Sequence, residues 1–285
     1  MRLIELGDAN SFLSRSSSLL MGAEAENQLL LSSALTLARA SAGRSPRLSF
    51  FIIENNGITE AAALNVTHRR FLLSTSSREA AFFMGKEFAN RAPELSCLMG
   101  PSEPVLAFAD GFAHGGGTPF SISQTQLTLR LTQLMPITPA SGMWRVAKEK
   151  DLKLLREWSF AFVAECNLDE PPEETEEVVR RYVESRQLFI WEDPKPVAMA
   201  GFGGITPNGV RVNMVYTRPN ARARGYAASL VAAISHKLLA SGAHKQCFII
   251  VDADNAPALK VYERLGYRRV SESLEMRRPP DLMSI

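Results

Sequence analysis

A six-residue turn late in the chain carries the residue types that bind a phosphate group. It runs from Arg222 to Ala227 and separates an apolar, strand-like segment from an amphipathic, helix-like one. The first backbone N–H groups of a helix lack intrahelical partners, and the helix dipole adds partial positive charge beside them. Gly225 permits close approach of the backbone, and two arginines supply charged donors. By itself, the hexapeptide is also compatible with an arginine-bearing surface turn.

The segments around the turn decide between these two interpretations. Leu230, Ile234 and Leu238 recur at helical spacing after it, and Gly242 is a typical helix stop. The next apolar run, 246–251, would pair in parallel with the strand before the turn through a right-handed crossover. This order places the turn at a helix N-terminus, where phosphate binding is favoured.

Asn255 and Tyr262 follow the second strand, seven residues apart, and Tyr262 lies in a short predicted helix. Taken alone, Tyr262 is as compatible with a core aromatic residue as with a catalytic one. Its spacing from Asn255, directly after the strand, favours a functional role.

With these motifs in order, residues 143–278 resemble the GCN5-related N-acetyltransferase (GNAT) superfamily. VYTRPNARARGYAASLVAAIS is similar to its acetyl-CoA-binding motif, and DNAPALKVYERLGYRRV is similar to the motif that follows. The resemblance implies an α/β (α+β) fold whose mixed central sheet is flanked by helices and contains two splayed parallel strands. It also implies an N-acetyltransferase that uses acetyl-CoA as cosubstrate and no metal. A primary amine would attack the acetyl group directly, within a ternary complex.

The resemblance assigns roles on the donor side of the reaction. Backbone groups of the first strand would bind the pantetheine arm, and the amides of the turn would hold the diphosphate. Asn255 would contact the pantetheine or help shape the cleft beneath it. Tyr262 would protonate the leaving thiolate, and a backbone N–H near Met214 or Val215 could stabilise the oxyanion. The implied cosubstrate-binding residues are Met214, Val215, Tyr216, Thr217, Arg222, Ala223, Arg224, Gly225, Tyr226, Ala227, Asn255 and Tyr262.

Three carboxylates are candidates for the acceptor side. Glu165, Asp169 and Glu170 follow the first predicted helix of this half, where the family often places acceptor-binding residues. A solvated acidic loop is the commoner explanation for any one of them, but together they would favour a cationic amine. The acceptor itself, a small molecule or a peptide amine, stays open. So does the general base, since a water chain can remove the proton.

The end of the second strand departs from the family pattern. Charged Asp252 and Asp254 stand where relatives often have Thr-Asp followed by small apolar residues. This departure keeps an alternative open, namely a catalytically inactive acyl-CoA-binding sensor or interaction module.

The chain of 285 residues suits two domains. The segment 135–142 contains two prolines and a glycine and predicts a linker, which gives domains at 1–138 and 139–285. The first domain is expected to be a smaller α/β domain that resembles the GNAT fold only in its broad pattern. Its role is open. No internal repeat is evident.

The expected helices of the first domain are 8–20, 24–40 and 77–91, and its expected strands are 48–54, 61–67, 70–74, 104–108 and 125–134.

Composition limits the partners and the compartment. The balance of 32 Lys and Arg against 30 Asp and Glu argues against a nucleic-acid binder. Cys97, Cys166 and Cys247 form no pair with disulfide-framework or zinc spacing, which favours a reducing compartment. No apolar run is long enough to span a membrane, and Glu5 and Asp8 interrupt what would be the core of a signal peptide. We therefore expect a cytoplasmic protein without nucleic-acid or membrane partners, with a homodimer left open.

Overall fold

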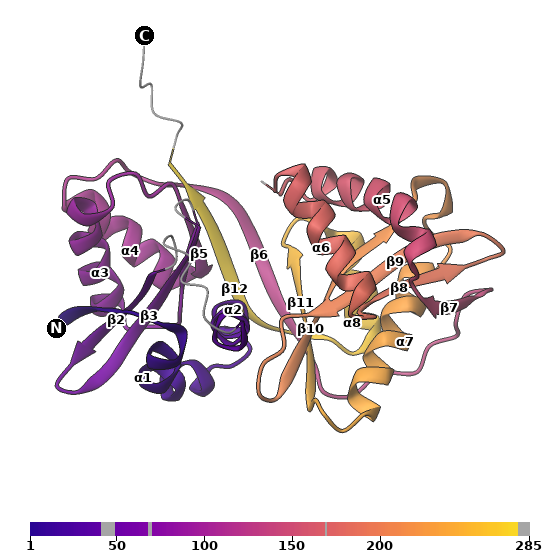
Figure 1. Ribbon diagram of the computed structural model, residues 1–285, viewed down its shortest axis with the longest axis horizontal. Helices are drawn as coiled ribbons and strands as arrows, with labels where there is room; N and C mark the ends of the chain where they lie inside the picture. Colours follow the sequence, from indigo (N-terminus) through magenta and orange to yellow (C-terminus); the bar gives the residue numbers. More distant parts are fainter. Residues whose placement is uncertain (41–48, 68–69, 169, 279–285) are drawn as a thin grey trace, which may run out of the picture. The chain divides into compact units, whose positions relative to one another are not determined.

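The computed structural model describes residues 1–40, 49–67, 70–168 and 170–278 (Figure 1). The chain divides into two compact units: unit 1 contains Met1–Thr128 and the strand residues from Val270, and unit 2 is Leu129–Arg269. The chain therefore passes from unit 1 to unit 2 within strand β6 (Ser121–Leu131) and returns within strand β12 (Arg268–Arg277). The sequence had suggested a boundary later, in the linker after β6.

Unit 1 is an α/β unit with a mixed sheet. Its strands lie in the order β1-β2-β3-β4-β5-β12, in which only β4 and β5 are parallel neighbours. The elements are β1 (Arg2–Leu6), α1 (Ala9–Gly22), α2 (Gln28–Arg39), β2 (Ser49–Asn55), β3 (Ile58–Thr67), β4 (Arg70–Leu73), α3 (Arg78–Arg91), β5 (Cys97–Pro101), α4 (Ser102–His114) and β6.

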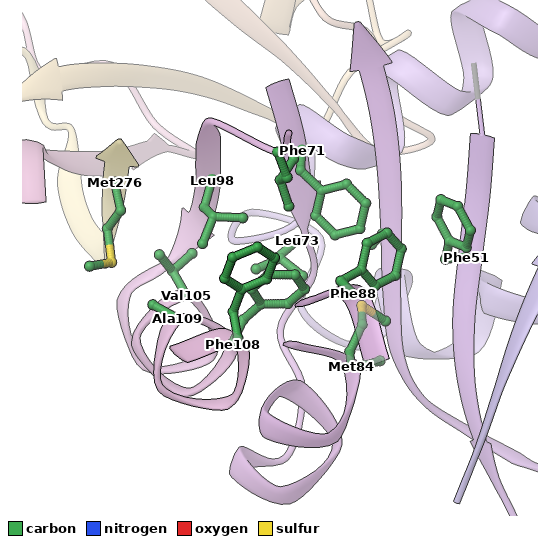
Figure 2. Packing of buried hydrophobic residues seen from close by; sticks show 14 of the residues in the cluster. Phe51, Phe71, Leu73, Met84, Phe88, Leu98, Val105, Phe108, Ala109 and Met276 are labelled. Atoms are coloured by element: carbon green, nitrogen blue, oxygen red, sulfur yellow. The ribbon is translucent and has the colours of Figure 1, made fainter. Parts of the chain in front are cut away.

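Alternate residues of the strands of unit 1 bury two separate cores, one on each face of its sheet. Phe50 packs with Phe12 of α1, at 5.3 Å between ring centroids. On the other face, the Phe71 ring lies 4.8 Å from Phe88 of α3 and 5.5 Å from Phe108 of α4 (Figure 2). Helices α1 and α2 therefore cover one face of the sheet, and α3 and α4 cover the other.

The expected strand at 104–108 is wrong, because these residues lie within helix α4. Val105, Phe108 and Phe112 recur at helical spacing and are all buried in the core beneath α3 and α4. A short apolar run is ambiguous between strand and helix when read by periodicity alone.

Unit 2 repeats the order of helices and strands of unit 1, a duplication of the fold that the sequence did not reveal. Its strands lie in the order β11-β10-β9-β8-β7, and only β10 and β11 are parallel. The elements are β7 (Met143–Val146), α5 (Leu152–Glu165), α6 (Pro172–Glu184), β8 (Leu188–Glu192), β9 (Pro196–Gly203), β10 (Gly209–Thr217), α7 (Tyr226–Ala240), β11 (Gln246–Asp252), α8 (Ala256–Leu265) and β12.

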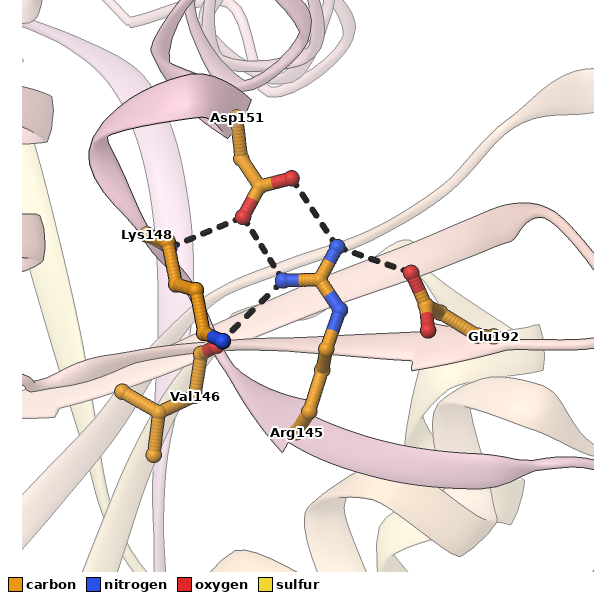
Figure 3. A network of polar contacts seen from close by, with 5 residues as sticks. All are labelled: Arg145, Val146, Lys148, Asp151 and Glu192. Carbon is orange, nitrogen blue, oxygen red and sulfur yellow. Dashed lines mark hydrogen bonds and ion pairs between the residues drawn. The ribbon is translucent and has the colours of Figure 1, made fainter.

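A partly buried arginine network ties the start of α5 to the edge of this sheet (Figure 3). Arg145 of β7 donates hydrogen bonds to both carboxylate oxygens of Asp151, at 2.6 and 2.9 Å, and forms an ion pair with Glu192 of β8 at 2.8 Å. The Lys148 backbone N–H also donates to Asp151, at 2.8 Å. Burial alone would raise the pKa of Asp151, but these bonds outweigh it and hold that pKa below its ordinary value.

Candidate active site

The parallel strands β10 and β11 separate toward their carboxyl ends. Their register joins Gly209–Arg211 to Gln246–Phe248 and, among the described residues, continues no further along either strand. The remaining residues of β10 and β11 are thus unpaired with one another. The splayed parallel pair that the sequence resemblance implied is therefore confirmed.

A β-bulge lies in β10 beside this opening. The pairing of β10 with β9 jumps from Asn213 opposite Gly201 to Tyr216 opposite Met199. Met214, inside the jump, has a left-handed φ of 52°, which is uncommon for a residue other than glycine. The register pairs neither Met214 nor Val215 with a described residue of β9 or β11. The oxyanion role of their N–H groups stays a prediction.

The turn after β10 has the geometry of an anion site. Gly225 is the N-cap of α7 with a φ of 81°, and Ala223 is also left-handed, with a φ of 62°. The first hydrogen bond of the helix runs from the Ser229 N–H to the Gly225 carbonyl, at 3.0 Å. No side chain of the described residues caps this helix end. The amides of its first turn can therefore donate to a phosphate, as the sequence predicts.

Unit 1 differs from unit 2 at the equivalent position. Strand β4 ends at Leu73 and α3 begins at Arg78, so the connection is only 74–77, against 218–225 in unit 2. Ser77 caps α3 with its own side chain, which accepts a hydrogen bond from the Ala80 N–H. The features of a phosphate site therefore lie in unit 2.

Arg222 is held by an ion pair that sequence reasoning did not foresee. Its Nη2 atom donates to both carboxylate oxygens of Glu165, at 2.7 and 2.8 Å, and its Nε atom donates to the Thr217 carbonyl at 2.9 Å. The hydrogen bond with Glu165 raises the pKa of Arg222. Glu165 thus binds the turn, 57 residues away in sequence, from the end of α5.

The side chain of Tyr226 also has a structural partner. Its hydroxyl donates to the Asp193 carboxylate at 2.6 Å, and the Ala140 N–H donates to Ser229 Oγ at 2.8 Å. Hydrogen bonds from Ser141 and Tyr226 lower the pKa of Asp193. These contacts fix the start of α7 against the turn between β8 and β9 and against the linker.

Tyr262 is buried in α8, with 6% of its surface exposed, and its ring centroid lies 6.0 Å from that of Tyr267. Burial raises the pKa of Tyr262 well above its ordinary value, and negative charge at Cys166 would raise it further. The phenol therefore keeps its proton, as a proton donor must. Burial likewise raises the pKa of Cys166 to about 11. Sequence reasoning missed Cys166 because a lone cysteine carries no spacing signal.

Three predicted site residues remain, Asn255, Asp169 and Glu170, and the structure describes the first and the last of them. Asn255 caps α8 through its side chain, which accepts a hydrogen bond from the Ala258 N–H at 3.1 Å. Glu170 follows α5 and is half-buried, whereas Asp169 lies outside the described residues. The proposed contact of Asn255 with pantetheine and the acceptor roles of the three carboxylates stay predictions.

Replacing Glu165 by glutamine separates the two roles open to this residue. If Glu165 positions the turn, Glu165→Gln should raise the KM for acetyl-CoA about two- to fivefold, because an exposed ion pair contributes up to about 1 kcal/mol. The kcat and the KM for the amine should stay unchanged. Steady-state kinetics with each substrate varied in turn would check this, and a rise confined to the amine KM would support the acceptor role instead.

The described residues contain no group of three or more His, Cys, Asp or Glu side chains arranged to hold a metal ion. Within the same part of the chain, no helix combines the length and apolar character needed to cross a membrane.

Comparison with known proteins bears on the family and the fold of the chain. Residues 152–267 match the model of the acetyltransferase (GNAT) family. No curated protein sequence matches the chain. Among solved structures, a GCN5-related N-acetyltransferase from Sphaerobacter thermophilus shares 15% identity at a TM-score of 0.66, with 99% of this chain and 98% of that chain covered.

Two further structures show the same fold along nearly the whole chain. A GNAT-family acetyltransferase from Colwellia psychrerythraea is 12% identical, with a TM-score of 0.59 and coverage of 98% of this chain and 100% of that one. A tandem GNAT protein from the clavulanic acid biosynthesis pathway is 13% identical, with a TM-score of 0.59 and coverage of 98% and 99%.

The family match identifies an acyltransferase. Residues 152–267 belong to the GNAT acetyltransferase family, and the fold of unit 1 is GNAT-like as well. The predicted family and fold class are both confirmed.

Proposed function

We propose that the protein transfers an acetyl group from acetyl-CoA to a primary amine, by direct attack within a ternary complex. The observation that carries this proposal is the turn at the start of α7, which has uncapped amides and directly follows the bulged, splayed strand β10. Strand β10 and the turn after it thus support both a phosphate site and a candidate oxyanion site at the opening between the strands.

The residues of unit 2 can divide the chemistry between them. Acetyl-CoA supplies the thioester carbonyl that the amine attacks. The amides at the start of α7 bind the diphosphate, and the N–H groups of Met214 and Val215 donate to the oxyanion that develops on that carbonyl. As the carbon–sulfur bond breaks, Tyr262 gives its proton to the leaving thiolate. The proton of the attacking amine leaves to water.

Two measurements on the purified protein test this function. Isothermal titration should show binding of acetyl-CoA, and a thiol-reactive dye should report release of free CoA when primary amines are added. The sensor alternative predicts binding without thiol release for every amine. Thiol release that requires an amine, together with an acetylated product in the mass spectrum, would exclude that alternative.

A further inference from the structure

Asp193 joins two other segments of unit 2 at the start of α7. It lies in the turn between β8 and β9, and its Oδ2 atom accepts a hydrogen bond from the Tyr226 hydroxyl at 2.6 Å. The Ser141 hydroxyl donates to the same oxygen, and Trp191 Nε1 donates to the Ser141 carbonyl at 2.8 Å. We call Ser141, Asp193 and Tyr226 the Asp193 cluster. One carboxylate oxygen therefore connects the first residue of α7 with the end of the linker.

Close packing holds this cluster in place. Tyr226 is buried, with 4% of its surface exposed. Gly142 has a left-handed φ of 92°, and a Cβ there would lie 2.1 Å from the Glu192 carbonyl oxygen and 2.8 Å from Asp193 Cβ. The end of the linker thus lies directly against the turn that carries Asp193, and neither segment can shift toward the other.

A second set of hydrogen bonds orients the peptide between Gly225 and Tyr226. The Ala140 N–H donates to Ser229 Oγ at 2.8 Å, and the Ser229 hydroxyl and N–H both donate to the Gly225 carbonyl, each at 3.0 Å. This carbonyl shares a planar trans peptide unit with the Tyr226 N–H, so the two groups point in opposite directions. Because the carbonyl points along α7, the Tyr226 N–H points out of the helix N-terminus.

We propose that Asp193 is a positioning residue for the diphosphate of the acetyl donor. By holding the side chain of Tyr226, it keeps the first amides of α7 in the direction in which they donate to phosphate. The inference rests on the proposed function and deepens it, because it assigns the selection of a diphosphate-bearing donor to a residue outside the turn. Asp193 would act through Tyr226 and not by contact, since a carboxylate repels an anionic diphosphate.

The charge of Asp193 strengthens this arrangement. Hydrogen bonds from Ser141 and Tyr226 lower its pKa, and the positive charge of Arg224 lowers it further, so the carboxylate is ionised at neutral pH. A hydrogen bond to an ionised acceptor is roughly twice as strong as one between neutral groups. Loss of this bond should therefore weaken the contacts of α7 with phosphate and leave the binding of pantetheine along β10 unaffected.

Two acetyl donors test the inference. Acetyl-CoA carries the diphosphate, whereas S-acetylpantetheine lacks it together with the nucleotide. Free thiol release would be measured with each donor and with the primary amine that gives the fastest release from acetyl-CoA. We expect Tyr226→Phe, which keeps the ring, to lower kcat/KM for acetyl-CoA about three- to tenfold, because one hydrogen bond to a charged acceptor is lost. The kcat/KM for S-acetylpantetheine should stay unchanged.

The outcomes separate this inference from the proposed function. A fall of equal size with both donors, or with neither, would overturn the inference while leaving the proposed function intact. If the wild-type protein releases no thiol with any amine, the proposed function is wrong. The Kd for CoA then decides on Asp193, since it should still rise about three- to tenfold in Tyr226→Phe. An unchanged Kd would overturn the inference in that case.

Further variants assign the effect to the carboxylate. Asp193→Ala removes the acceptor of both hydroxyls and should lower kcat/KM for acetyl-CoA at least as far as Tyr226→Phe does. Asp193→Asn keeps a neutral oxygen acceptor and should recover part of the loss. Tyr267→Phe, which also removes one hydrogen bond of a buried tyrosine, is the control and should leave the ratio of the two donors unchanged. The thermal midpoint would show that each variant is folded. A folded Asp193→Ala protein with the full kcat/KM for acetyl-CoA would contradict the assignment.

Discussion

Replacing Tyr262 by phenylalanine should lower kcat by about 100- to 10,000-fold, the range by which a positioned general acid accelerates a reaction. The phenol is buried, and burial holds its pKa well above the ordinary value. It therefore stays protonated at neutral and mildly alkaline pH and can give its proton to the departing thiolate. The ring is retained in Tyr262→Phe, so the Kd for acetyl-CoA should be unchanged. Thiol release at saturating acetyl-CoA and titration calorimetry would measure the two quantities.

Tyr267 provides a matched control for this experiment. It is a second buried tyrosine whose hydroxyl lies 2.9 Å from Ser235 Oγ. Tyr267→Phe should decrease the free energy of unfolding by about 1 kcal/mol, the usual net contribution of one hydrogen bond. Its kcat should stay within a fewfold of the wild-type value. A Tyr262→Phe protein that keeps its full kcat would show that another group protonates the thiolate.

Local sequence signals predicted unit 2 better than unit 1. The strand, turn and helix around Gly225 are encoded within a short stretch, because spacing and a glycine suffice to define them. Part of the helix at 102–114 was misread because the short apolar run at 104–108 is compatible with both a strand and a helix. The return of β12 to pair with β5 could not be read either, since Leu274 and Gly100 are distant in sequence and periodicity carries no information on which strands pair.

The residues of the candidate site also differ in whether the sequence alone could predict them. The turn at 222–227 and Tyr262 could be proposed from the sequence because each lies in a contiguous motif. The contacts of Glu165 with Arg222 and of Tyr226 with Asp193 join segments that meet only after folding. The bulge at Met214 leaves no mark in the residue types, since methionine is not a residue that favours a left-handed φ.

Replacing Gly225 by valine should raise the Kd for acetyl-CoA by about 30-fold or more, because a left-handed backbone costs a residue other than glycine about 1–3 kcal/mol. The φ of Gly225 is 81°, and the only non-neighbouring atom of the described residues within 4 Å of an added Cβ is the Ala140 Cβ, at 3.8 Å. A clash therefore does not account for the expected effect. The strain would be relieved by rotation of the turn, which moves the amides at the start of α7 away from the diphosphate.

Gly242, just beyond the other end of α7, separates this effect from a general loss of stability. It also has a left-handed φ, of 71°, and an added Cβ would meet no non-neighbouring atom of the described residues within 4 Å. Gly242→Val should thus lower the thermal midpoint to a similar extent as Gly225→Val but leave the Kd for acetyl-CoA unchanged. Titration calorimetry and thermal unfolding of both variants would make the comparison. Equal Kd values in the two variants would mean that the turn does not hold the diphosphate, because only at Gly225 does the strained residue adjoin the donating amides.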